Sequence, residues 1–131
     1  MTIEQYIDAQ PTNRQHLLRD LHGLILNYDR TVVAEVSNMM GKRMILYHQD
    51  GYFKYGLSGE TKLLALHCMP MYCNKALRDQ FSQLLNNAKF QKGCINFISE
   101  QDLQMAVIAD LIDASAKVNI PVIMSGLKQR K

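Results

Sequence analysis

The side chains best suited to soft-metal or nucleophilic chemistry in this sequence are a histidine and three cysteines: His67, Cys68, Cys73 and Cys94. The gap between Cys68 and Cys73 falls within the range of a zinc-binding pair, but no second Cys or His pair follows it. His67 and Cys68 are neighbours in a predicted strand, so they point to opposite faces. We therefore predict no metal site and no cofactor, and interpret the cysteines as free thiols that pack as small apolar groups.

Nucleophilic catalysis is an alternative use of the same residues. A cysteine nucleophile needs a base within hydrogen-bond reach, and His48 or His67 would have to approach Cys94 across a sheet. The sequence contains no Gly-x-Ser-x-Gly elbow, phosphate-binding glycine loop or His-Glu-x-x-His motif. An enzyme that uses Cys94 or His67 stays an alternative, while a domain without catalytic residues is the preferred interpretation.

Hydrophobic spacing predicts the elements that would position these side chains. Apolar stripes with a period of 3.6 residues indicate helices over 17–28, 77–88 and 103–118. Capping-box patterns, which begin helices, occur at three places: Thr2, Thr12 and Ser99. Pro11 separates a short first helix from the second, since the residue before a proline disfavours helical geometry. The segment from Ile120 onward receives no assignment.

Between the helices, short runs of branched and aromatic residues indicate strands at 32–36, 43–48, 52–57, 63–69 and 92–98. Asp50-Gly51 favours a tight hairpin turn between two of them. Ser58-Gly59-Glu60 joins the next two, and connections this short cannot carry a parallel crossover. We predict an α+β fold of two layers: an antiparallel sheet of about five strands, with helices at the N-terminus, before the last strand and at the C-terminus.

Length and charge narrow the class of protein. The 131 residues, with 47% hydrophobic and 21% charged side chains, predict one globular domain over 1–131. The net charge of +3 comes mostly from Lys128, Arg130 and Lys131, so we expect neither a nucleic-acid partner nor binding to a membrane surface. The N-terminus shows no secretory signal pattern, which favours a cytoplasmic location.

Three segments resemble the YdhG-like domain, a bacterial family of unknown function. They are 2–7 in the first helix, 35–40 before the hairpin-joined strands, and Lys92-Gly93-Cys94-Ile95-Asn96-Phe97, which is similar to the family's Lys-Gly-Thr-Ile-Arg-Phe. The resemblance covers about 2–118 and leaves 119–131 as a C-terminal extension. This chain departs from the family at Met39-Met40-Gly41, where Gly-Met-Pro is usual, and at Asn96, where Arg is usual.

The family has been grouped with frataxin-like proteins, and this resemblance implies a role in binding or delivering iron. Iron would require a surface rich in carboxylates. The best acidic pair, Glu4 and Asp8, lies one turn apart on the first helix. A solvated helix face explains this pair more simply, so iron handling stays an alternative.

The strand at 63–69 carries apolar side chains on both faces, which points to recognition. Leu64, Leu66 and Cys68 share one face, and Ala65, His67 and Met69 share the other. Helices in a two-layer fold cover one sheet face, so we expect a ligand, a partner subunit or the segment 122–124 to cover the second. The alternative is that helices wrap both sides of a central strand.

We predict a small-molecule pocket or a homodimer surface on that second face. Its residues are Arg43, Tyr47, Tyr55, His67, Met69 and Lys92. Methionines near the strand ends, at 39, 40, 44, 69 and 71, either line such an adaptable cavity or fill the core.

Overall fold

Six α-helices and a short 3-10 helix make up the helical part of the fold. The computed structural model describes residues 1–61 and 63–129, and the side chains of 1–61 and 63–126. The helices are α1 (Ile3–Asp8), α2 (Thr12–Tyr28), α3 (Met69–Cys73), α4 (Lys75–Leu84), η1 (Glu100–Asp102), α5 (Met105–Ala116) and α6 (Ile120–Gln129). Of the predicted basic tail, Arg130 and Lys131 lie outside the described residues.

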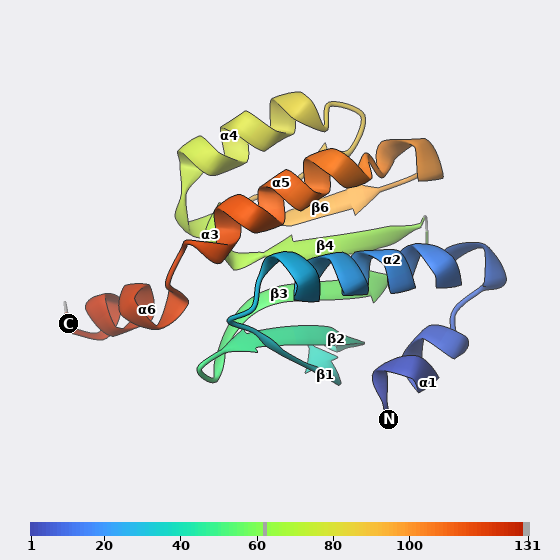
Figure 1. The fold of residues 1–131 in the computed structure, drawn as a ribbon, viewed down its shortest axis with the longest axis horizontal. Helices are drawn as coiled ribbons and strands as arrows, with labels where there is room; N and C mark the ends of the chain where they lie inside the picture. Colours follow the sequence, from blue (N-terminus) through green and yellow to red (C-terminus); the bar gives the residue numbers. More distant parts are fainter. Residues whose placement is uncertain (62, 130–131) are drawn as a thin grey trace.

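The strands form one antiparallel sheet. They are β1 (Val33–Met39), β2 (Lys42–Gln49), β3 (Tyr52–Gly59), β4 (Leu64–Cys68), β5 (Lys89–Phe90) and β6 (Cys94–Phe97). Their order across the sheet is β1-β2-β3-β4-β6-β5, and each neighbouring pair is antiparallel. The first four strands therefore follow the chain order of a meander, and the segment 69–93 carries α3 and α4 before the chain returns to β6 beside β4 (Figure 1).

Two tight turns join the first three strands. Asp50 and Gly51 both have positive φ, 49° and 84°, as a type I′ hairpin turn requires. Met40 and Gly41 adopt the same pattern with φ of 54° and 74°. Met40 is a long side chain in a backbone region that usually favours Gly or Asn, and this turn holds it at the surface with 75% of it exposed.

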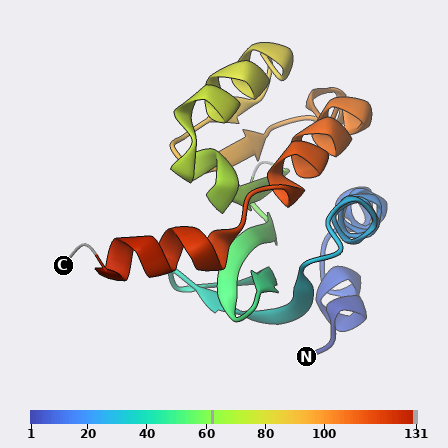
Figure 2. The same ribbon diagram turned by 60° about the vertical axis from the view of Figure 1, so that its left-hand side comes forward.

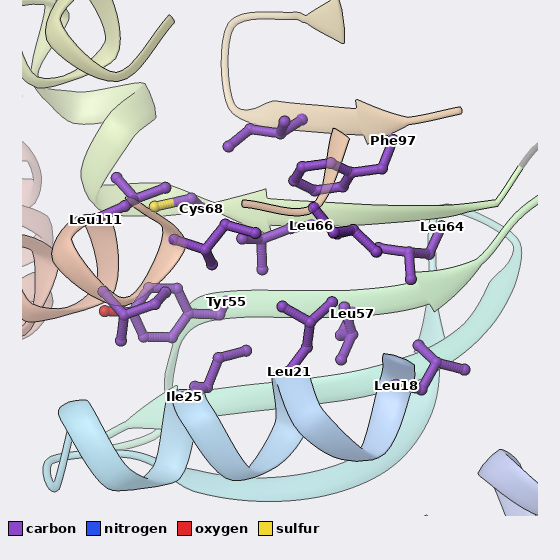
Figure 3. Close-up of a cluster of buried hydrophobic side chains, with 14 of the residues drawn as sticks. Leu18, Leu21, Ile25, Tyr55, Leu57, Leu64, Leu66, Cys68, Phe97 and Leu111 are labelled. Carbon is purple, nitrogen blue, oxygen red and sulfur yellow. The ribbon is translucent and has the colours of Figure 1, made fainter. Parts of the chain in front are cut away.

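Helices α2 and α5 pack over one face of the sheet, and the hydrophobic core lies between the two layers (Figures 1 and 3). Leu18, Leu21 and Ile25 of α2 and Leu111 of α5 point toward the strands. On this face the strands contribute side chains that are fully or almost fully buried: Tyr55, Leu57, Leu64, Leu66, Cys68 and Phe97. Burial of a side chain of this size contributes about 1.5–3 kcal/mol, so this interface holds the two layers together.

The α+β fold class is confirmed, with helices at the predicted places and a sixth, two-residue strand beside β6. The capping box at Thr2 forms as predicted. The one at Thr12 does not, because Pro11 occupies the cap position and α2 begins at Thr12 itself. The box at Ser99 opens η1, and the long helix begins only at Met105 after a break.

The unassigned C-terminal stretch forms α6, which leaves the end of α5 and projects to one side of the molecule (Figure 2). Ile120 at its start is fully buried and donates its backbone N–H to Gln49 Oε1 at 3.0 Å. Within the described ranges, no helix combines the length and the apolar character needed to cross a membrane.

Candidate functional site

A groove of about 500 Å³ lies on the sheet face opposite α2 and α5. Residues from five parts of the chain line it: Met39, Met40, Phe53, His67, Met69, Tyr72, Gln91, Lys92, Gly93 and Cys94. Most of these side chains are apolar, and the volume is within the range of pockets that hold small molecules. Among the side chains that the structure describes, none from α6 lines this groove.

The floor of the groove depends on a glycine. Gly56 of β3 pairs with His67 of β4, so both lie on the groove face. A Cβ added to Gly56 would come within 3.0 Å of Met44 Sδ and 3.3 Å of the Phe53 ring. Gly56 therefore leaves room for the Met44 and Phe53 side chains beside the strand, and a larger residue there would displace one of them.

A smaller hollow of about 200 Å³ continues from the groove along the same face. The two share Met39, Met40, His67, Gln91 and Cys94 in their linings. The smaller hollow is more polar at its far end, where Lys42 Nζ and Glu60 Oε1 form an ion pair at 2.6 Å. The site therefore runs from an apolar end at Phe53, Met69 and Tyr72 to a polar end at the Lys42–Glu60 pair.

His67 and Cys94 are directly opposite each other on the antiparallel strands β4 and β6. Burial lowers the pKa of His67, with Glu60 opposing the shift, and burial raises the pKa of Cys94 to about 11. At neutral pH the pair is therefore a neutral imidazole beside a protonated thiol. Reactive cysteines have lowered pKa values, so the structure juxtaposes the two predicted residues without activating the thiol.

Lys92 provides the positive charge at the groove. The side chain is exposed, and no acidic group in the described part of the chain lies within ion-pair distance of it. The backbone carbonyl of Lys92 accepts a hydrogen bond from Arg78 Nη1 at 3.3 Å, which ties the loop 91–93 to α4. An ammonium group at the rim of an apolar hollow favours a ligand with one anionic end.

The structure brings three of the six predicted site residues together: His67, Met69 and Lys92 line the groove. Tyr47 and Tyr55 pair with each other across β2 and β3, and Tyr55 pairs with Cys68, so both tyrosines lie on the face covered by helices. The prediction that they lie on the same face as His67 is therefore wrong. Tyr55 pairs with Cys68 rather than with His67, and a shift of one residue between strands moves a side chain to the other face of the sheet. Arg43 lies at the edge of the helical side, where Nη1 is 3.9 Å from Met1 Sδ.

The two tyrosines instead serve the core. Tyr47 Oη lies 2.8 Å from His22 Nδ1 of α2, and burial lowers the pKa of that histidine. Tyr55 Oη donates to Asp29 Oδ2 at 2.8 Å. Neither ring is exposed to solvent. Both hydroxyl groups are thus satisfied by helix-side partners, as buried tyrosines require.

Asp29 and Lys54 form an ion pair that the sequence analysis missed. Both side chains are 0% exposed, and Lys54 Nζ lies 2.9 Å from Asp29 Oδ2. A β-bulge at Tyr47/His48 shifts the pairing so that Lys54 has no cross-strand partner. This irregularity turns Lys54 toward the helix layer beside Tyr55. Regular alternation along the strand would place Lys54 at the surface. Its burial is not predicted from the sequence because it results from the bulge.

The arrangement of acidic and sulfur ligands gives little support to a metal centre. Glu4 and Asp8, the predicted acidic pair, both bind Arg19, at 3.3 Å and 2.6 Å. Cys68 is buried beside Ser115 Oγ on the helix side, whereas Cys73 is exposed. Across residues 1–61 and 63–129, no three His, Cys, Asp or Glu side chains gather in an arrangement that could hold a metal ion.

Comparison with known proteins adds no relative to this picture: no protein-family model, curated protein or solved structure matches the chain.

Proposed function

We propose that this protein is a small binding domain in which a groove on the sheet face opposite α2 and α5 takes up an apolar molecule with one anionic end. The observation that supports it most strongly is the groove of about 500 Å³, lined by methionine and aromatic side chains on the face that α2 and α5 leave open. Soluble proteins rarely leave a large apolar hollow without a use. The flexible thioethers of Met39, Met40 and Met69 would adapt to ligands of different shape.

The charges around the groove specify the ligand further. Lys92 has no acidic partner among the described residues, whereas Lys42 is already paired with Glu60. A carboxylate at Lys92, with the apolar body lying toward Phe53, Met69 and Tyr72, would satisfy both parts of the groove. His67 is neutral at physiological pH and would act as a hydrogen-bonding group at the floor.

Titration calorimetry with 2-naphthoate and its neutral analogue 2-naphthamide tests the proposal. Cys94→Phe places a ring where the groove and the smaller hollow meet, and should weaken naphthoate binding at least tenfold. Cys73→Phe is the matched control, because Cys73 is exposed and absent from the groove lining. Lys92→Met should weaken binding of the acid and leave binding of the amide unchanged. Equal effects of the two cysteine variants, or no binding of either probe, would refute the proposal.

A thiol enzyme is the second candidate, because β4 and β6 place His67 directly opposite Cys94. The raised pKa of Cys94 argues against it, and the thiol's described hydrogen bond goes to Asn96 Oδ1 at a long 3.9 Å. The iron-handling alternative, the YdhG-like relationship and the cytoplasmic location all stay predictions. Purified protein that binds no iron at micromolar concentration would remove the first of these.

A further inference from the structure

The edge strand β1 points to a second copy of this chain as a partner. At the other edge of the sheet, β5 has only two residues, but β1 has seven. Every second residue of an edge strand directs its backbone N–H and C=O away from the sheet. Proteins usually protect a long edge with lysine, proline or an irregular strand, and β1 (VAEVSNM) contains neither lysine nor proline.

The exposed apolar side chains at the two ends of β1 suggest how a second copy would pair. Val33 at the start of the strand is 74% exposed, and Met40 just after its end is 75% exposed. Antiparallel pairing about a two-fold axis places the start of one strand beside the end of the other. It therefore brings Val33 of each copy next to Met39 and Met40 of the other, and both exposed residues become covered.

The length of β1 and its single charge together select the register. Pairing centred on Val36 sets Glu35 opposite Ser37 of the partner subunit, and all seven residues find a partner. Pairing centred on Glu35 would instead place two carboxylates directly opposite each other, which is destabilising. Glu35 is the one charged residue of β1, so the register centred on Val36 contains no like-charge contact within the paired strands.

A surface hollow at the start of β1 would receive the partner's side chain. It has a volume of about 420 Å³ and is lined by Thr31, Val33, Glu35, His48, Asp50 and Gly51. In the register centred on Val36, the partner's Met40 lies beside this hollow. We propose that two copies join through β1 into one continuous antiparallel sheet, with Val36 on the two-fold axis. This proposal does not depend on what the groove binds.

Sedimentation velocity over a range of protein concentrations tests the pairing, with two substitutions at the exposed Ser37. Ser37→Glu would face Glu35 of the partner subunit twice per dimer and should weaken dimerisation roughly tenfold. Ser37→Lys is the matched control, since it would face the same carboxylate and should leave the dimer as tight as the wild type or tighter. The charge-reversed double variant E35K/S37E should restore the dimer.

Circular dichroism and thermal unfolding would show that the substitutions leave the fold intact, as expected at solvent-exposed positions. A wild-type protein that sediments as a monomer at every concentration would overturn the proposal. Identical self-association of the Glu and Lys variants would overturn it as well, because that result would place the interface elsewhere.

Discussion

Replacing Asp29 by Asn should be among the most destabilising single changes in this protein. The carboxylate lies at the C-terminal end of α2 and is paired with Lys54 at 2.9 Å, with both side chains fully buried. Without the carboxylate charge, the acceptors of the buried ammonium among the described residues are all neutral: Thr31 Oγ1 at 3.2 Å, the carbonyl of Ala116 at 3.4 Å and the new amide oxygen at position 29. Removing one partner of a buried ion pair costs about 3–5 kcal/mol, a large part of the stability of a typical domain.

The opposite truncation should cost less. In Lys54→Met the carboxylate still accepts hydrogen bonds from the Thr31 backbone at 3.0 Å and from Tyr55 Oη at 2.8 Å. We expect a loss of about 1–3 kcal/mol, and a double variant whose loss is smaller than the sum of the two. Urea unfolding of the three variants measures these values. Asp79→Asn is the control, because its ion pair with Lys75 is exposed and should contribute nothing measurable.

The pH dependence provides a second readout for Asp29. Burial alone would raise the pKa of this carboxyl, but hydrogen bonds from Thr31, Lys54 and Tyr55 outweigh burial and hold the pKa below 3.8. A lowered folded-state pKa contributes stability above the unfolded value, and this contribution is lost as pH falls through the folded-state pKa. The stability difference between wild type and Asp29→Asn should therefore shrink below pH 3.8. A constant difference, or a Lys54→Met variant less stable than Asp29→Asn, would refute the reasoning.

Two further predictions follow from single side chains. At pH 7.5, iodoacetamide should alkylate Cys94 more slowly than a free thiol, because burial raises the pKa of Cys94 to about 11. Mass spectrometry should show that the alkylation rate rises about tenfold per pH unit. Fast alkylation at neutral pH would instead support the alternative in which Cys94 is a nucleophile. Thr2→Ala removes the side chain that accepts from the Gln5 N–H at 3.1 Å, so it should cost about 0.5–2 kcal/mol in thermal unfolding, and an unchanged melting temperature would contradict this role.

The layers of this fold follow from local patterns, and the sequence predicts them well. Alternation in the strand around Leu66 correctly places Leu66 on the helix side of the sheet and Ala65 and His67 on the opposite face. The Asp50-Gly51 dipeptide correctly predicts a hairpin, since its two positive φ angles suit these residues. Such signals depend on a few neighbouring residues, and tertiary contacts do not change them.

The candidate site depends on relations between strands, and here the sequence is less informative. Alternation within a strand shows which of its side chains share a face, but not which side chains of the next strand lie on that same face. The register between β2, β3 and β4 decides this for Tyr47 and Tyr55. The bulge that buries Lys54 has no local signature. The Met40-Gly41 turn, which places two methionines at the groove, is likewise unusual because most such turns use Asn or Gly. The sequence therefore predicts His67, Met69 and Lys92 at the groove, whereas Phe53 and Tyr72 are found there only from the three-dimensional arrangement.

Methionine methyl NMR tests the central claim most directly, because the eight methionines of the chain lie in different parts of the fold. Protein with ¹³C-labelled methionine methyl groups would be titrated with 2-naphthoate. We predict that the signals of Met39, Met40 and Met69 shift together along one binding curve, while the signal of Met105, on the helix side, stays in place. Shifts spread equally to Met105, or no shifts at the three groove methionines, would contradict the account.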